Sequence, residues 1–182
     1  MHAPEAKLAD QDGNGLVPVE DGWFIVNAAD TRSYKHPHSG QYISFENRER
    51  HPFPHYGIGI HCLWPGQASA MYHAESNQES FMVLEGECRL IVEGEERIMR
   101  KWDFFHCAPM TRHITVGAGD GPCALLMVGA RLPAEELEYP HDPLAAKYNA
   151  QSPEPTSDPK VAYSELVGEW VPGPFTWPVS SV

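Results

Sequence analysis

The chain has 182 residues, 42% of them apolar, and a formal net charge of −12. This length suits one domain with a substantial core, and the acidic charge argues against nucleic acid or an anionic membrane as a partner, because both attract a basic surface. No run approaches the roughly 20 apolar residues of a membrane-spanning helix, and the first residues lack the basic start and apolar run of a secretory signal, so we expect a cytoplasmic protein.

The first 20 residues are polar and interrupted by proline and glycine, which predicts a loose N-terminal arm over 1–20. Residues 23–28 are predicted to form the first strand. His36-Pro37-His38 follows, and we interpret this pair of imidazoles as part of a surface loop, because a proline separates them and their neighbours are polar. Residues 41–45 alternate between polar and apolar and predict another strand.

Short strand-like runs separated by turns then follow one another as far as residue 131, with no helical crossover between them. In the run 56–64, Gly57, Gly59 and His61 share one face, which is therefore thinly covered by side chains, as expected where another group approaches the backbone closely. Strands at this regular spacing predict an all-β antiparallel sandwich or barrel over residues 21–131.

The remaining segment, 132–182, differs in character and is predicted to be a tail with short helices, at 133–138 and at 144–148. Residues 151–159 form a Ser/Pro/Glu stretch with the composition of disorder. Side chains as large as those near the end of the tail usually pack on something, so we expect this part to lie across the barrel or on a partner subunit. These side chains are Trp170, Phe175 and Trp177.

The four cysteines lie within or beside apolar strand-like runs and contain no C-x-x-C pair. We interpret them as buried free thiols in a reducing compartment, since free cysteine behaves as a small hydrophobic residue. The missing paired spacing argues against a structural zinc site built from them. The four residues are Cys62, Cys88, Cys107 and Cys123.

Histidine and carboxylate recur at an even spacing at His73, Glu75 and Glu79, and a second histidine follows at His113. Side chains an even number of residues apart share a face of a β-strand, and a tight bend between Glu75 and Glu79 still lets both strand ends point into one cavity. Two imidazoles and one or two carboxylates suit a divalent first-row metal with open coordination positions. The candidate metal ligands are therefore His73, Glu75, Glu79 and His113.

These residues resemble the two motifs of the cupin superfamily, G-x5-H-x-H-x3/4-E-x6-G and G-x5-P-x-G-x2-H-x3-N. Gly66 and Glu79-x6-Gly86 fit the first motif, His73 lies one residue late for its first histidine, and Glu75 replaces its second. His113 matches the second motif. The other positions of that motif depart from the pattern, where Trp102, Ala108, Met110 and Gly117 stand in place of Gly, Pro, Gly and Asn.

The resemblance implies a double-stranded β-helix, or jelly-roll, barrel with His73, Glu79 and His113 as metal ligands. Glu75 is then either a fourth ligand or a catalytic base beside the metal. The ligand pattern is similar to that of 3-hydroxyanthranilate dioxygenase, whose iron is held by two histidines and one glutamate. That enzyme type also uses arginines near the site, whereas Ser69 and Gly117 occupy the comparable positions here, so its substrate is not supported.

Three functions remain open for such a barrel. A small-molecule oxidoreductase resembling the non-haem iron dioxygenases fits a two-histidine, one-carboxylate site, whose free positions admit dioxygen or a chelating substrate. A metal-dependent isomerase or lyase would use the metal as a Lewis acid. A non-catalytic cupin would bind a sugar or another small ligand, with the metal structural or absent. The divalent metal is Fe(II), Mn, Zn or Ni, with Fe or Zn favoured.

Four further residues are expected to line the pocket. His61 and His106 lie on strands near it and are either proton shuttles or hydrogen-bonded structural residues. Phe81 and Val83 share the parity of Glu79 and therefore its face. The residue before His113 should point to the opposite face and form a surface salt bridge.

We also expect a homodimer, because the barrel offers apolar side chains at positions that alternate with the inward-facing ones. These are Met82, Leu84, Ile114 and Val116.

Overall fold

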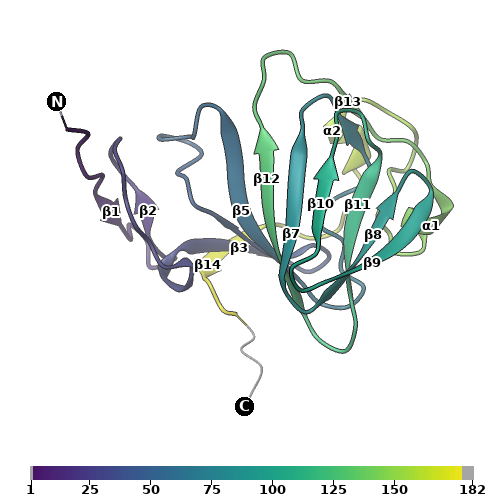
Figure 1. Cartoon of the computed structure of the whole chain (residues 1–182), viewed down its shortest axis with the longest axis horizontal. Helices are drawn as coiled ribbons and strands as arrows, with labels where there is room; N and C mark the ends of the chain where they lie inside the picture. The colour runs from purple at the N-terminus through teal and green to yellow at the C-terminus, as the bar shows by residue number, and fades with distance from the viewer. Residues whose placement is uncertain (1, 178–182) are drawn as a thin grey trace.

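Two antiparallel sheets dominate the computed structural model, which describes residues 2–177. The larger sheet has seven strands, the smaller has three, and Figure 1 shows them side by side as the two walls of the barrel. In spatial order the large sheet contains β10 (Phe104–Cys107), β7 (Glu79–Glu85), β12 (Cys123–Ala130), β5 (Tyr56–Leu63), β4 (Gly40–Ser44), β3 (Arg32–His36) and β14 (Val171–Pro174). The small sheet contains β11 (His113–Ala118), β8 (Glu87–Val92) and β9 (Glu95–Arg100).

One apolar cluster between the two sheets forms the barrel core. Leu63, Val83 and Leu125 come from the large sheet and pack against Leu90 and Met99 of the small one, and each is less than 7% exposed. These residues alternate with outward-facing ones along their strands, so burying one face of each strand holds the sheets together. The prediction of an all-β jelly-roll barrel is confirmed.

A second apolar cluster lies on the outer face of the small sheet. Ile114 and Val116 of β11 are 1% and 0% exposed, because Ala145, Ala150 and the backbone around Ala68 cover them. Their alternation with His113 is as predicted, but their exposure is not. The expectation that these two side chains are available for dimer contacts is therefore wrong.

The N-terminal arm contains a two-stranded hairpin of β1 (Leu8–Ala9) and β2 (Val17–Pro18), which lies to the left of the barrel in Figure 1. The strand predicted over 23–28 is absent. Trp23 makes one isolated bridge, and the chain then turns into the 3-10 helix η1 (Ala28–Asp30). The side chain of Asn27 caps this helix by accepting from the backbone N–H of Ala29 at 2.9 Å, which favours the turn over an extended strand.

The interpretation of His36 as a loop residue is also wrong. His36 is the last residue of β3 and is 3% exposed. Its Nδ1 accepts from the backbone N–H groups of His38 and Ser39 at 3.2 and 3.3 Å, so it closes the β3–β4 turn. Its role is structural.

The C-terminal segment wraps the barrel and contributes strands as well as the short helices α1 (Pro143–Ala146) and α2 (Pro159–Ala162). The predicted helix at 133–138 is instead the strand β13 (Leu137–Glu138), which pairs with β6 (Ala74–Glu75). Pairing with an available edge outweighs the weak helical preference of so short a run.

The stretch 151–159 is ordered against the barrel, despite its composition. Tyr139 and Thr156 exchange backbone hydrogen bonds of 2.8 and 3.3 Å, and Ser152 is 1% exposed. The end of the tail packs on its own barrel, because β14 pairs with β3 and the ring of Trp170 lies 5.2 Å from that of His36. Among residues 2–177, no helix is long and apolar enough to cross a membrane.

Candidate metal centre and cavity

Two histidines on adjacent backbone segments point their rings into one end of the barrel. His73 and His113 are joined by two backbone hydrogen bonds of 3.1 and 2.8 Å, and their ring centroids lie 4.8 Å apart. Nδ1 of His73 lies 2.8 Å from the carbonyl of Met71, and Nδ1 of His113 lies 3.0 Å from that of Thr111. A carbonyl only accepts, so each Nδ1 carries a proton and each Nε2 is directed to the site, the usual arrangement of metal-binding histidines.

Glu79, the first residue of β7, completes a group of three. One ligand atom from each of His73, Glu79 and His113 lies within 4.8 Å of the others. Oε2 of Glu79 is buried 3.1 Å from Nε2 of His113, and no group among residues 2–177 satisfies the geometry of a hydrogen bond to it. A carboxylate and two imidazole nitrogens that face one point fit a divalent cation, so the residues present suit the metal that the sequence motifs imply.

The charge environment of this group also favours a cation. Burial by itself lowers the pKa of His113, but Cys107 and Glu79 outweigh it and raise that pKa to about 10. Burial and the proximity of His113 lower the pKa of His73 to about 4, so that imidazole is neutral. One positive charge is therefore stable beside Glu79, and a metal ion would replace the proton there.

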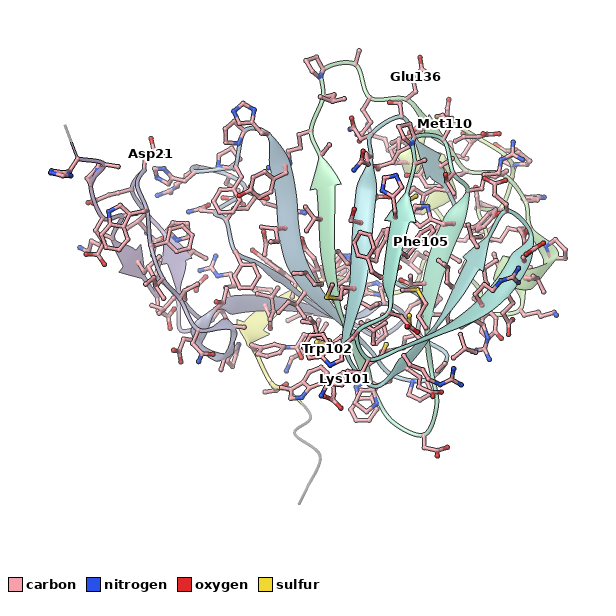
Figure 2. All side chains as sticks on the ribbon, viewed as in Figure 1. Asp21, Lys101, Trp102, Phe105, Met110 and Glu136 are labelled. Atoms are coloured by element: carbon pink, nitrogen blue, oxygen red, sulfur yellow. The ribbon has the colours of Figure 1, made fainter. Side chains whose placement is uncertain are left out.

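Aromatic rings fix the two imidazoles from behind. Tyr139 stacks on His73 with a centroid separation of 5.8 Å, and Phe81 and Phe105 lie 5.3 and 5.9 Å from His113. Figure 2 labels Phe105 on β10, with Met110 and Glu136 at one end of the barrel and Lys101 and Trp102 at the other. The site belongs to the Met110 end, because the backbone N–H of Met110 donates to the carbonyl of Glu75 at 2.7 Å.

Glu75 is not part of the three-residue group, so the structure brings together three of the four predicted ligands. It lies on β6 in the wall of the same cavity as Glu79. Burial, Glu79 and Glu135 raise the pKa of its carboxyl to about 8. A carboxyl that titrates near neutrality can donate or accept a proton, which is the property required of an acid–base residue.

The cavity in front of these residues has a volume of about 740 Å³. Its floor is the inner face of the large sheet, where strand register aligns Glu79 with Gly129 and Gly57. A cavity of this size holds a small organic molecule. Its walls include residues that the sequence reasoning did not propose: Tyr34, Tyr42, Ser44, Glu46, Arg48, Arg131, Glu135, Tyr163 and Trp170.

The thinly covered face of β5 is confirmed, and the approaching groups belong to the chain itself. A Cβ atom on Gly59 would lie 2.6 Å from the hydroxyl of Tyr42, and one on Gly57 would lie 3.1 Å from Nη2 of Arg131. Arg131 in turn donates two hydrogen bonds to the buried carboxylate of Glu46. The glycines therefore make room for two side chains that shape the cavity.

The four predicted pocket residues have different places. His61 lines the cavity, and burial lowers its pKa to about 4, so it is a neutral ring whose Nε2 donates to the carbonyl of Ser39 at 2.6 Å. Phe81 packs under His113, and Val83 lies one step deeper in the barrel core. The expectation for His106 is wrong, because its side chain is exposed while its neighbours on β10 face inward.

Two smaller expectations are confirmed. Arg112 forms a surface salt bridge with Glu138 at 3.1 Å. The four cysteines are buried free thiols, and Sγ of Cys107 lies 3.3 Å from Nδ1 of His113.

A family model described as "Cupin domain" matches residues 59–129, which hold all three residues of the group. Residues 59–129 therefore form a cupin domain. A structure titled as a putative sugar phosphate isomerase from Acidithiobacillus ferrooxidans is 24% identical, with a TM-score of 0.50 over 57% of this chain and 67% of that one. The polyketide cyclase RemF from Streptomyces resistomycificus is 13% identical, with a TM-score of 0.53 over 62% and 83% of the two chains.

These similarities show the cupin fold and leave the reaction open, since cupins with one fold can differ in function. No curated protein matches the chain in sequence. The activity of this cupin must therefore be argued from its own residues.

Proposed function

We propose that this cupin binds one divalent metal ion through His73, Glu79 and His113 and acts on a small organic molecule in the adjacent cavity. The observation that carries the proposal is the convergence of one ligand atom from each of these three residues within 4.8 Å, where the buried Oε2 of Glu79 has no hydrogen-bond partner among the described residues and Glu79 lines a cavity of about 740 Å³. Three protein ligands leave coordination positions open.

Within this proposal, an oxidoreductase that resembles the non-haem iron dioxygenases is the function that the ligand set supports best. Two histidines and one carboxylate with open positions are typical of Fe(II) oxygenases, and bound iron would supply the oxygen chemistry. The protein residues hold the metal, and the rings of Phe81, Phe105 and Tyr139 fix the imidazoles.

A metal-dependent isomerase or lyase is the second candidate, and Glu75 is the observation that favours it. Its carboxyl titrates near pH 8 and lies in the cavity wall beyond the metal group, where it would move a proton to or from a bound substrate. In an oxygenase the same residue would serve as an acid–base group beside the metal. Glu75 is thus the candidate catalytic residue in both.

Metal analysis tests the proposal without knowledge of the substrate. The protein is purified anaerobically and supplied with Fe(II), Mn(II), Ni(II) or Zn(II) in turn, and bound metal is measured after gel filtration. We expect one ion per chain, lost in His73→Ala and His113→Ala. The matched control is His106→Ala, because His106 is an exposed histidine on the neighbouring strand β10. Equal metal content in all variants refutes the metal site.

Nitric oxide distinguishes the two candidate reactions. Addition of nitric oxide to an Fe(II) protein with an open position produces a characteristic paramagnetic resonance signal. This signal, together with oxygen uptake in the presence of Fe(II) and candidate substrates, supports the oxidoreductase. Metal-dependent exchange of substrate hydrogen with solvent, without oxygen uptake and abolished by Glu75→Gln, supports the isomerase or lyase. Stable metal binding with neither property supports the non-catalytic cupin.

A further inference from the structure

The cavity wall farthest from the metal group carries a second set of polar side chains. Tyr42 and Ser44 are on β4, and Glu46 lies two residues beyond its end. These alternate positions share one face, and all three side chains line the cavity. Three lateral steps in the sheet, β7 to β12 to β5 to β4, separate this wall from Glu79. At roughly 4.8 Å between neighbouring strands, the strand that carries Glu79 and the strand that carries Tyr42 and Ser44 lie roughly 14 Å apart.

Ser44 is the first sign that a ligand belongs at this wall. The residue is 5% exposed and lines the cavity, yet its hydroxyl has no hydrogen-bond partner among the described residues. A buried hydroxyl without a partner is unfavourable, so a group that pairs with it from the cavity would remove that cost.

Two more donors converge on the same place. Ser44 is paired with Gly59 across the strands, and the hydroxyl of Tyr42 lies directly over Gly59. Nη2 of Arg48 donates to that hydroxyl at 3.3 Å and the guanidinium stacks on the ring, so the proton of the Tyr42 hydroxyl remains free to donate. Ser44, Tyr42 and Arg48 thus present hydroxyl and guanidinium N–H donors on the same wall of the cavity.

Arg48 retains guanidinium N–H groups for an anion although it lies beside Glu46. Glu46 is buried, but Arg131 already neutralises it through two hydrogen bonds. Arg48 forms an ion pair with Glu46 at 3.6 Å, which is longer than a hydrogen bond, and the Arg48 side chain is 60% exposed. Glu49 also lines the cavity, and it forms no ion pair with Arg48.

We propose that Ser44, Tyr42 and Arg48 form an anion-binding subsite that anchors the carboxylate or phosphate group of the substrate, while the opposite end of the molecule reaches the metal group. Guanidinium and hydroxyl donors recognise oxyanions of either kind, and the guanidinium contributes a charge-assisted hydrogen bond. The proposal rests on the proposed function in naming the ligand a substrate. The subsite itself stands without the metal.

The test is calorimetric titration of the full-length protein with inorganic phosphate and, separately, with malonate, with and without Zn(II). We expect at least one anion to bind in the metal-free protein and to bind about tenfold more weakly to Arg48→Gln, since one charge-assisted hydrogen bond is lost. The anion that binds more tightly identifies the group. The matched control is Arg97→Gln, because Arg97 is equally exposed, at 61%, and pairs with Glu95 on β9.

Ser44→Ala keeps the proposal falsifiable if Arg48→Gln alters the fold. Removing an unpartnered buried hydroxyl should raise the melting temperature while weakening anion binding, a combination that a purely structural role would not produce. Anion binding unchanged in both variants, equally weakened in Arg97→Gln, or absent from the metal-free wild type overturns the subsite. Failure of metal binding with anion binding intact refutes the proposed function and leaves the subsite standing.

Discussion

The buried carboxylate of Glu46 depends for its stability on Arg131, and removing that arginine gives the most quantitative prediction. The Glu46 side chain is 0% exposed, and Arg131 donates two hydrogen bonds to it while also donating to the carbonyl of Phe53 at 2.6 Å. Replacing Arg131 with Met leaves the carboxylate buried without its main partner. Loss of one partner of a buried pair costs about 3–5 kcal/mol.

Two features of the structure reduce this cost. Arg131 is itself 33% exposed, and Arg48, 3.6 Å from the carboxylate, can move closer. We therefore expect Arg131→Met to lower the free energy of unfolding by about 2–3 kcal/mol, and the melting temperature by about 5–10 °C, for a chain of this length. Urea denaturation at neutral pH measures the first quantity, and differential scanning calorimetry the second.

The pH dependence of this loss follows from the pKa of Glu46. Burial raises that pKa, but the hydrogen bonds from Arg131 and from the backbone of Phe53 outweigh burial and hold it below its ordinary value of 4.5. The pair therefore contributes stability above the ordinary pKa, and the contribution disappears as pH falls through the lower folded value. In Arg131→Met, burial dominates and the penalty vanishes once the carboxyl is protonated. The difference between wild type and variant should therefore begin to shrink above pH 4.5, as the buried carboxyl of the variant takes up its proton, and shrink further below 4.5 as the wild-type pair is protonated.

A double variant provides the control. Glu46→Gln in the Arg131→Met background removes the buried charge, so most of the lost stability should return, to within about 1 kcal/mol of wild type. Arg97→Met breaks an exposed pair and should cost less than about 1 kcal/mol. An Arg131→Met loss no larger than that of Arg97→Met, or a double variant no more stable than Arg131→Met, refutes the reasoning.

Three further predictions concern the site and the assembly. His73→Ala and His113→Ala should abolish metal retention while His106→Ala retains it, and elemental analysis that finds metal in the first two contradicts the ligand assignment. In the metal-free protein the pKa of Glu75 is raised from 4.5 to about 8, so stability should fall as pH rises from 4.5 to 8. Glu75→Gln should lessen this fall, and melting temperatures of wild type and variant that change equally with pH would disprove it. The homodimer stays a prediction: Met82 and Leu84 are partly exposed on the outer face of β7, where a second copy of the chain would bury them. Wild type should then sediment at about twice the 20.3 kDa chain mass and Leu84→Glu at the chain mass, and a monomeric wild type rules it out.

The sequence was sufficient to predict the barrel and three clustered candidate ligands wherever local spacing carries the information. The parity of Glu79, Phe81 and Val83 correctly predicts a shared face, because alternation is a property of the strand itself. The hydrogen bonds that orient the two imidazoles are also local, because Nδ1 of His73 and of His113 each bonds the carbonyl two residues earlier, at Met71 and at Thr111. The fold and the three-residue group could be read from such patterns.

Other features depended on which segments pack together. The outward positions Ile114 and Val116 are buried because the C-terminal segment crosses them. Whether His106 points into or out of the barrel depends on how β10 pairs with β7, which the sequence of β10 does not specify. The run 133–138 forms a strand because an edge at β6 is available to it. Contacts between residues distant in sequence override such short local preferences.

The sequence by itself determined the candidate metal-ligand residue types, the strand-rich barrel and the acidic charge, because spacing and composition are written directly in the chain. Only the tertiary structure decided that Glu75 lies outside the ligand group, that Arg131 neutralises Glu46, and that an unpartnered serine faces the cavity beside Arg48. Each of these depends on the curvature and register of the sheet. Register brings together strands separated by many residues, and side-chain spacing within any one strand does not specify it.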